Sequence, residues 1–341
     1  MRRQLKNTFR DTILALAGVL AVVGTAQAAA DPQPGLGITV RPVVTGDLEV
    51  LFDIGIVNAG LERLGYTVAK PKTLSLALLY ASVAQGDGDY AAETWWPGHK
   101  FVYENSGGAA KSTLVGTYMQ GASQGYFIDK RTAEEFHITN IDQLKDPKIA
   151  ALFAGRAGGK AELIGCEPGW GCERIIDHQL KAYDLTSTVT QVKGSAEILF
   201  ANIISKYKNG DRVLYYTYTP LWVQQVLVPG KDVVPLAVPF TSLPQGAAEG
   251  DVSTLDSEGR NVGWITNTIK ILGNNEFLAK NPAARRWLER VTVPTADVNR
   301  ENYRIYQGEK STADIERHVQ EWLAAHKAQV DAWVAEAAAT P

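Results

Sequence analysis

Short β-branched segments alternate with amphipathic helical segments along this chain of 341 residues, and this alternation limits the possible folds more than any other feature. The first block is predicted to run strand, helix, strand, helix, strand over residues 38–40, 48–64, 66–68, 74–84 and 89–95. Alternating strands and helices with short connections favour a parallel sheet covered by helices. The sequence therefore predicts an α/β fold.

A second block of the same kind begins near Gln124. The further predicted strands and helices lie at residues 125–128, 132–136, 180–183, 196–207, 213–217, 262–272 and 282–291. Residues 244–259 are rich in Gly, Pro and Ser, which predicts a surface crossover. Ser311 and Asp314 have the spacing of a helix cap, and the apolar stripe that follows to Val334 predicts one long amphipathic helix. Because both halves are α/β, a small ligand is expected in a cleft between them.

The first residues have the pattern of a secretory signal peptide. Basic side chains precede an uncharged, largely apolar run over residues 12–24, and Ala26-Gln27-Ala28 follows as a small-x-small cleavage site. A membrane anchor is the alternative, but this run is shorter than the roughly 20 residues that a membrane-spanning helix needs. The sequence thus predicts a signal peptide at residues 1–28 and a soluble protein exported to the periplasm.

The chain has 2 cysteines, Cys166 and Cys172, within the segment Gly-Cys-Glu-Pro-Gly-Trp-Gly-Cys. In an oxidising compartment a single pair this close predicts a disulfide. Two free buried thiols are the alternative, whereas a zinc site would need ligands that this spacing does not supply. The bridge would hold Trp170 in a rigid, Gly-rich loop that can present backbone N–H groups beside an aromatic wall.

Aromatic residues gather in three segments that follow predicted strands or lie in the cysteine loop. These segments contain Trp95 and Trp96 close to His99, then Trp170, and finally Tyr215, Tyr216, Tyr218 and Trp222. Because side chains alternate along a strand, Trp95 and Trp96 cannot both face the core, so one is expected to face a pocket or solvent. A methylated ammonium ion has no N–H to donate, and aromatic faces attract it. With His99 and loop N–H groups for an anion, the pattern predicts a betaine-type zwitterion as ligand.

Other classes of function have weaker support in the sequence. A net charge of -3 gives no electrostatic footprint for nucleic acid. Gly-Ala-Ser-Gln-Gly around Ser123 matches G-x-S-x-G, which makes an exported serine hydrolase an alternative. That motif requires a helix after the Ser, however, and the residues after Ser123 have a strand pattern. The 5 His lack the spacing of metal ligands. We therefore expect a binding protein that is not an enzyme and needs no metal or cofactor.

Three segments carry a resemblance to a known family. They are Gln-Gly-Tyr-Phe-Ile-Asp-Lys ending at Lys130, Ile-Thr-Asn-Ile-Asp-Gln-Leu-Lys-Asp-Pro-Lys ending at Lys148, and the cysteine loop ending at Glu173. With these segments the chain resembles the periplasmic binding proteins of glycine betaine/proline betaine ABC transporters (the ProX type) over essentially its whole mature length. The resemblance implies the type II periplasmic binding protein fold, with lobe 1 at residues 29–118 plus 247–341 and lobe 2 at residues 119–246.

The same resemblance implies a ligand site. In the family, three Trp side chains cage the ammonium group, and a His and two backbone N–H groups hold the carboxylate. The matching positions are Trp95, Trp170 and Tyr218 for the cage, and His99, Gly171 and Cys172 for the carboxylate. Tyr218 departs from the family's Trp and offers less ring area, while Trp96 receives no role. The implied partners are the permease and ATPase of an ABC importer, with the protein a monomer. Choline, carnitine or dimethylsulfoniopropionate as ligand, and docking on a sensor instead of a transporter, remain alternatives.

Overall fold

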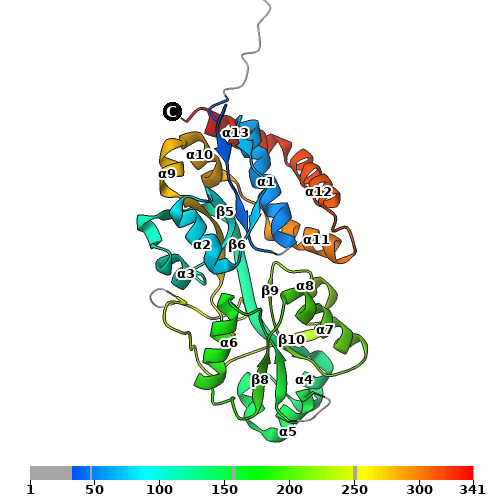
Figure 1. Cartoon of the computed structure of the whole chain (residues 1–341). Helices are drawn as coiled ribbons and strands as arrows, with labels where there is room; N and C mark the ends of the chain where they lie inside the picture. Colours follow the sequence, from blue (N-terminus) through cyan, green and yellow to red (C-terminus); the bar gives the residue numbers. More distant parts are fainter. Residues whose placement is uncertain (1–32, 47, 156–158, 249–251, 341) are drawn as a thin grey trace, which may run out of the picture. The chain divides into compact units, whose positions relative to one another are not determined.

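The computed structural model describes residues 33–46, 48–155, 159–248 and 252–340, and Figure 1 shows how their helices and strands are arranged. The predicted signal peptide lies outside the described residues. The strands are β1 (Thr39–Val40), β2 (Val43–Val44), β3 (Thr67–Val68), β4 (Lys72–Thr73), β5 (Tyr90–Trp96), β6 (Ser112–Asp129), β7 (Ala161–Ile164), β8 (Val189–Val192), β9 (Leu214–Thr219), β10 (Val233–Leu236) and β11 (Asn267–Asn274). The helices are α1 (Glu49–Arg63), α2 (Leu76–Gln85), α3 (Lys100–Asn105), α4 (Lys130–Phe136), α5 (Pro147–Ala150), α6 (Gly171–Ala182), α7 (Ala196–Lys208), α8 (Val223–Val226), α9 (Asn275–Lys280), α10 (Pro282–Arg290), α11 (Thr295–Tyr306), α12 (Thr312–Ala325) and α13 (Lys327–Ala338), with short 3-10 turns η1 (Gly108–Ala110), η2 (Ile141–Lys145) and η3 (Ala151–Phe153).

A mixed sheet organises the described part of the chain. Its strands follow the order β5–β11–β6–β9–β7–β8, and β10 pairs with β6 outside this path. Strand β6 pairs antiparallel with β11, β9 and β10, whereas β7 pairs parallel with β8 and β9. The expected α/β class is confirmed. Parallel pairing is present between β1 and β3, between β2 and β4, and between β7 and its neighbours β8 and β9. The expectation of a parallel sheet is wrong for the pairs that β6 forms and for the pair of β5 with β11, which are antiparallel.

Strand β6 also corrects the predicted start of the second block. The strand expected at residues 125–128 is the last part of β6, which is 18 residues long. Gly116 and Gly121, which resemble turn residues in the sequence, have positive φ angles of 62° and 75° inside this strand. The pairing of β6 with β11 shifts register on both sides of Ile269, near these two glycines. They therefore occupy irregularities of the bulge type, which bend a strand without ending it.

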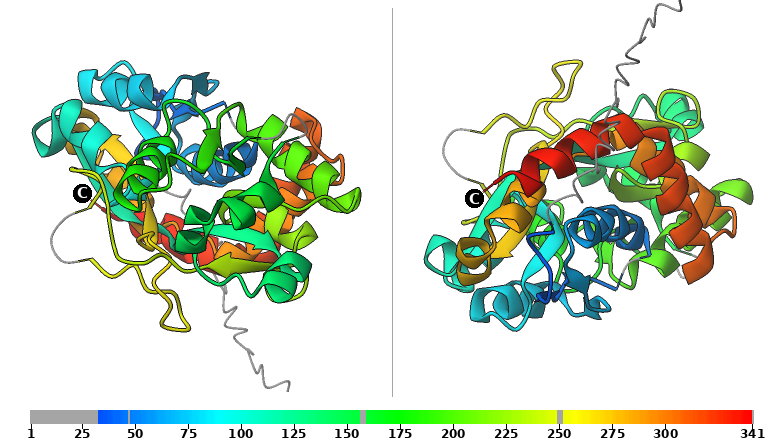
Figure 2. Two further views of the ribbon diagram at one scale, coloured as in Figure 1. Left: turned by 90° about the horizontal axis from the view of Figure 1, so that it is seen from below. Right: turned by 90° about the horizontal axis from the view of Figure 1, so that it is seen from above.

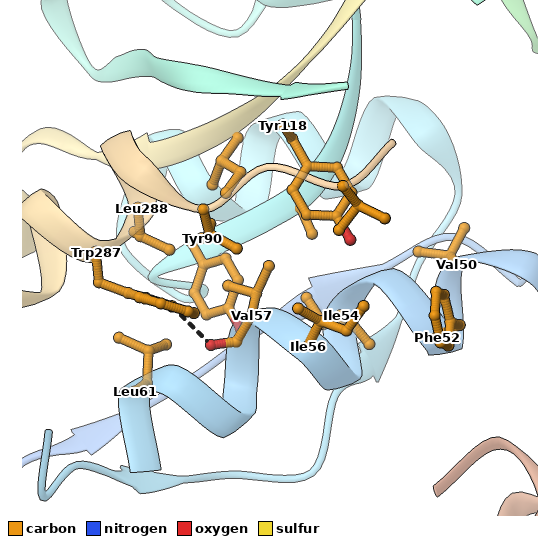
Figure 3. Close-up of a cluster of buried hydrophobic side chains, with 14 of the residues drawn as sticks. Val50, Phe52, Ile54, Ile56, Val57, Leu61, Tyr90, Tyr118, Trp287 and Leu288 are labelled. Atoms are coloured by element: carbon orange, nitrogen blue, oxygen red, sulfur yellow. Dashed lines mark hydrogen bonds between the residues drawn. The ribbon is translucent and has the colours of Figure 1, made fainter. Parts of the chain in front are cut away.

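The largest hydrophobic core packs α1 against the sheet and the C-terminal helices. Its α1 members include Val57 and Leu61, which are fully buried, and Figure 3 shows them beside Trp287 of α10. The indole N–H of Trp287 donates to the carbonyl of Val57 over 2.9 Å, so this large buried ring also satisfies its polar atom. A Cβ atom on Gly60 would overlap the Trp287 ring, which explains why this turn of α1 is glycine.

Two further cores lie on the faces of the sheet formed by β7, β8, β9 and the end of β6. They contain buried residues from Tyr126 to Trp264, whereas the largest core contains none between Ala122 and Ile269. The predicted lobe boundaries stay a prediction. Ala247 packs in the same core as the residues after Tyr126. This packing favours an end of lobe 2 nearer residue 265 than the predicted residue 246.

The C-terminal region forms two helices where the sequence predicted one. The expected cap is present, because the Ser311 hydroxyl accepts from the Asp314 N–H and the Asp314 carboxylate accepts from the Ser311 N–H. Helix α12 then ends at Ala325, and α13 begins at Lys327 after a non-helical His326. Helix α12 contacts α1, whereas α13 contacts mainly α10 and to a smaller extent α1. The right-hand view of Figure 2 shows the change of direction between the two helices. No helix among the described residues has the length and apolarity to cross a membrane.

Candidate ligand-binding site

The two adjacent tryptophans at the end of β5 have different surroundings. Trp95 lines a cavity of about 90 Å³. Trp96 meets the ring of Tyr103 edge-on, with ring centroids 5.6 Å apart, and is not among the cavity's lining residues. This is the outcome expected from the alternation of side chains along a strand. One Trp therefore lines the candidate cavity, and its neighbour packs against α3.

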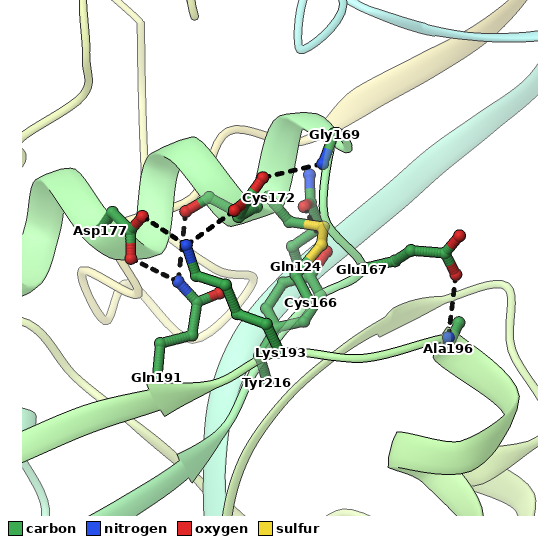
Figure 4. Close-up of a disulfide and its surroundings, with 11 residues drawn as sticks. Gln124, Cys166, Glu167, Gly169, Cys172, Asp177, Gln191, Lys193, Ala196 and Tyr216 are labelled. Atoms are coloured by element: carbon green, nitrogen blue, oxygen red, sulfur yellow. Dashed lines mark hydrogen bonds and ion pairs between the residues drawn. A yellow bond between two sulfur atoms is a disulfide. The ribbon is translucent and has the colours of Figure 1, made fainter. Parts of the chain in front are cut away.

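The cysteine loop delivers the second aromatic ring at the start of α6. Cys166 and Cys172 are joined in a disulfide across Cα atoms 6.0 Å apart, which confirms the predicted bridge (Figure 4). Within the loop, the Gly169 N–H donates to the Glu173 carboxylate over 2.8 Å, which closes the loop onto the first turn of α6. Trp170 occupies the N-cap position in an extended conformation and lines the cavity.

The first turn of α6 also supplies N–H groups at the cavity. Gly171 and Cys172 are the first two residues of the helix, and both line the cavity. The N–H groups of a helix's first turn have no carbonyl partner within the helix, and the helix dipole places partial positive charge there. This end of the cavity is therefore suited to an anion.

Tyr218, near the end of β9, brings the three rings together. Its ring centroid lies 5.4 Å from that of Trp95, at an interplanar angle of 89°, and 6.3 Å from that of Trp170. Phe200 supports the same ring from α7, edge-on, at 5.9 Å. Three rings from β5, the cysteine loop and β9 thus converge on one cavity.

His99 follows β5 and has a defined hydrogen-bonding role. The Trp95 N–H donates to His99 Nδ1 over 3.3 Å, so this nitrogen is an acceptor. Burial lowers the pKa of His99 to about 4, which keeps the ring neutral at physiological pH. In a neutral imidazole the other nitrogen then carries the proton, so Nε2 is a donor. His99 Cδ2, the carbon next to Nε2, would lie 3.9 Å from a Cβ atom built on Gly171, so this donor is beside the helix N-terminus.

All six residues that the sequence assigned to ligand binding line this one cavity. They are Trp95, His99, Trp170, Gly171, Cys172 and Tyr218. Sequence reasoning missed a polar wall that lines the same cavity and consists of Glu49, Asp53, Glu93 and Asn302. Glu93 lies two residues before Trp95, and the alternation of side chains along a strand could have identified it. Asp53 and Asn302 carry no such signal, because each looks like an ordinary helical polar residue.

The polar wall has unusual electrostatics. Asp53 is only 2% exposed and accepts from the Tyr118 hydroxyl over 3.0 Å. Burial, followed by the negative charge of Glu93, holds the pKa of Asp53 well above its usual range. Glu93 in turn accepts from the Trp95 indole N–H over 3.1 Å, which fixes this carboxylate beside the aromatic rings.

Serine chemistry at Ser123 lacks its required context. Ser123 lies inside β6 and pairs with Thr219 of β9. The residues that follow it, through Asp129, continue the strand. A nucleophile elbow places its Ser on a sharp turn between a strand and a helix, and the backbone at Ser123 is extended instead. Among the described residues, no group of His, Cys, Asp and Glu is arranged to hold a metal ion.

Comparisons with known proteins agree with this architecture. Residues 39–325 match the family model described as the substrate binding domain of ABC-type glycine betaine transport systems. The chain is 46% identical to the glycine betaine-binding periplasmic protein OusX of Dickeya dadantii, over 95% of this chain and 97% of that protein. It is 45% identical to the glycine betaine/proline betaine-binding periplasmic protein of Escherichia coli, over 97% of this chain and 99% of that protein.

Solved structures support the fold independently. Lactococcal OpuAC, in its closed conformation with glycine betaine, superposes with a TM-score of 0.66 at 20% identity, over 87% of this chain and 99% of that one. An ABC-transporter choline-binding protein in complex with choline gives a TM-score of 0.67 at 18% identity, over 86% of this chain and 91% of that one. At these identities the likeness establishes the fold alone.

Proposed function

Because the chain belongs to the family of substrate-binding domains of ABC-type glycine betaine transport systems, we propose that it captures glycine betaine or proline betaine and delivers it to an ABC importer. The observation that carries this proposal is the convergence of the rings of Trp95, Trp170 and Tyr218 on a cavity that also holds a helix N-terminus. A betaine has one methylated cation and one carboxylate, and the cavity has a counterpart for each.

The three rings are the proposed cage for the ammonium group. Methyl groups exclude conventional hydrogen bonds to the cation, so recognition relies on ring faces and dispersion. Each face contributes about 0.5–1 kcal/mol when exposed and about 2 kcal/mol or more when desolvated. Closure of the two proposed lobes around the ligand would exclude water and place the cage at the upper end of that range.

The ligand carboxylate is proposed to bind at the N-terminus of α6. The backbone N–H groups of Gly171 and Cys172 and the Nε2–H of His99 are the donors. Hydrogen bonds to a charged group contribute about 1.5–3 kcal/mol each, more than neutral ones. The disulfide holds Trp170 and the two N–H groups in one short segment, so the cation and anion contacts have a fixed separation.

The remaining parts of the proposal follow the family. The relatives are periplasmic proteins by name, and we propose that this chain is exported to the same compartment through residues 1–28. There it would act as a monomer and present its ligand to the permease and ATPase subunits of the importer. Substrate-binding proteins of this kind release their ligand unchanged, so binding without turnover is expected.

Isothermal titration calorimetry with glycine betaine, proline betaine, choline and proline tests the proposal. We expect saturable binding of the two betaines, one per chain, and much weaker binding of proline, whose ammonium carries no methyl groups. Trp95→Ala should weaken betaine binding by about 1–2 kcal/mol or more, whereas Trp96→Ala is the matched control one position along the strand. Binding of proline alone, or equal losses in the two variants, would refute the cage.

A further inference from the structure

The polar wall of Glu49, Asp53, Glu93 and Asn302 offers hydrogen-bond acceptors that a fully methylated ammonium group cannot use. The carboxylates of the wall can attract such a cation only through their charge. Its residues come from three elements: Glu49 and Asp53 from α1, Glu93 from β5 and Asn302 from α11. Glu49 and Asp53 are four residues apart and share one face of α1, while Glu93 and Trp95 share one face of β5. All four residues line the cavity that holds the aromatic rings.

Asn302 is the residue of the polar wall whose amide is both buried and unpaired among the described residues. The residue is 1% exposed, and neither its amide nitrogen nor its amide oxygen has a hydrogen-bond partner among the residues that the structure describes. Leaving a buried polar group unsatisfied costs about 1–3 kcal/mol, and such groups are rare in native proteins. Because Asn302 lines the cavity, a ligand that offers both a donor and an acceptor would satisfy it.

The other residues of the wall add acceptors. The Glu93 carboxylate lies at the edge of the Trp95 indole, and each of its oxygens can accept more than one hydrogen bond. Asp53 faces the charges of Glu93, Glu301 and Glu49 and the hydroxyl of Tyr118. Glycine betaine has no N–H or O–H group, so it can donate no hydrogen bond to any of these acceptors.

We propose that Asn302, Glu93 and Asp53 form a second subsite, which recognises a hydrogen-bond donor carried by the onium ligand itself. This inference rests on the proposed betaine-binding function and narrows its ligand class. The donor is either an N–H that remains on an incompletely methylated ammonium or a hydroxyl close to a fully methylated one. Both groups would reach the same acceptors beside the cage.

The two sources of the donor can be separated by ligand choice. N,N-Dimethylglycine replaces one methyl group of glycine betaine with N–H, and L-carnitine keeps all three methyl groups and adds a hydroxyl. The measured quantity is the ratio of the dissociation constant of each donor ligand to that of glycine betaine, by calorimetry, in wild type and variants. A substitution that weakens the cage for both ligands alike changes both dissociation constants by the same factor. Their ratio therefore reports only the effect on the donor group.

We expect Asn302→Leu to raise this ratio about tenfold or more for at least one of the two donor ligands. Glu93→Gln keeps an oxygen for the Trp95 indole and removes the charge, so it should shift the ratio in the same direction by a smaller factor. Glu276→Gln, at an exposed position on α9 that does not line the cavity, is the control and should leave the ratio unchanged. A response to dimethylglycine identifies an N–H subsite, and a response to carnitine identifies a hydroxyl subsite.

Two results would overturn the inference. One is that the wild-type protein binds neither donor ligand, and the other is that neither Asn302→Leu nor Glu93→Gln changes the ratio for either ligand. Because Asn302 is buried, circular dichroism must show that Asn302→Leu is folded. If Asn302→Leu is not folded, Glu93→Gln alone decides the test. Failure of wild type to bind glycine betaine is a distinct result, which refutes the proposed function and with it the basis of this inference. Unchanged ratios in a wild type that does bind glycine betaine refute the donor subsite alone.

Discussion

The ring of Tyr218 stands edge-on to the indole of Trp95, with the two centroids 5.4 Å apart and the planes at 89°. The two rings therefore form a corner rather than a stack, and the Trp170 ring lies tilted to that of Tyr218, with centroids 6.3 Å apart. A corner of aromatic faces leaves room for a compact cation, whereas parallel rings would pack against one another. If these rings form the proposed cage, the side chain at residue 218 should influence how well a cation fits it.

Tyr218→Trp is expected to preserve or tighten betaine binding, because Trp has the larger face and the stronger attraction for cations. Tyr218→Leu, which keeps an apolar side chain but has no ring, should weaken binding by about 1 kcal/mol or more. Calorimetry with glycine betaine measures both. A large loss of affinity in Tyr218→Trp would mean that residue 218 does not face the cation.

Reduction of the Cys166–Cys172 disulfide should weaken ligand binding while the protein remains folded. The bridge closes a short loop, and its removal costs at most about 2.4 kcal/mol of unfolding free energy in the chain-entropy model. The same loop positions Trp170 and the N–H groups of Gly171 and Cys172, so binding should suffer more than the fold. Calorimetry and thermal melts in the presence and absence of reductant would measure the two effects. An unchanged affinity after complete reduction would contradict this expectation.

Replacing His99 should affect ligands that carry a carboxylate most strongly. His99→Phe removes the Nε2 donor, and we expect glycine betaine to lose about 1.5–3 kcal/mol of binding free energy. Choline, which has no carboxylate, should lose less, and this difference separates loss of the donor from general damage to the cavity. Equal losses for the two ligands would assign His99 a structural role instead.

The lowered pKa of His99 also predicts a pH dependence of stability. With a folded-state pKa of about 4 and an unfolded value near 6.5, the unfolded chain binds more protons between these values. Stability of the ligand-free protein should therefore fall as pH decreases from about 6.5 to 4. Urea unfolding across this range measures the slope, and His99→Phe should make it shallower. A slope that is identical in wild type and variant would exclude this contribution.

Ionisation of Asp53 should give a pH dependence of stability opposite to that of His99. Its pKa is raised in the folded state by burial and by Glu93, so ionisation favours the unfolded chain as pH rises above the unfolded value near 3.9. Asp53→Asn retains an oxygen for the Tyr118 hydroxyl and removes this penalty. We expect the variant to raise the melting temperature of the ligand-free protein more at pH 8 than at pH 5. A lower melting temperature at both pH values would be inconsistent with a strained carboxyl.

Gly60→Ala should destabilise the fold through the largest core. The added Cβ would overlap the Trp287 ring, and forcing extra atoms into a packed core costs about 1–3 kcal/mol. At Gly194 an added Cβ would meet Leu199 at 3.5 Å, an ordinary contact, so Gly194→Ala is the matched control. Urea unfolding compares the two, and similar midpoints would show that Trp287 adjusts without cost.

The sequence predicted the α/β class and the cysteine bridge because each depends on a local signal. Local signals also marked the three aromatic segments, whereas the choice of Tyr218 within the third segment followed from the family resemblance. Trp95 and Trp96 could be assigned to different surroundings from strand alternation, and the bridge from spacing and compartment. The antiparallel path of β6 was not predictable in this way, since Gly116 and Gly121 have the same appearance in a bulge as in a turn.

The polar wall escaped prediction for a different reason. Asp53 and Asn302 come from helices that are far apart in the sequence, and only the packing of α1 and α11 brings them to one cavity. The break at His326 was equally hidden, because the apolar stripe continues across it and gives no sign that α12 and α13 pack on different partners.

A single unbroken strand, β6, supplies hydrogen bonds to β11 near its beginning and to β9 and β10 near its end. Any insertion or chain cleavage between residues 112 and 129 would thus disturb several neighbours at once. The exposed segment around Glu258 lies between Leu255 and Asn261, which pair with each other in an isolated bridge. A change in this segment would not disturb the pairing of β6. A fluorescent reporter or a circularly permuted terminus placed there should leave ligand capture intact. This segment is therefore a suitable insertion site for a biosensor.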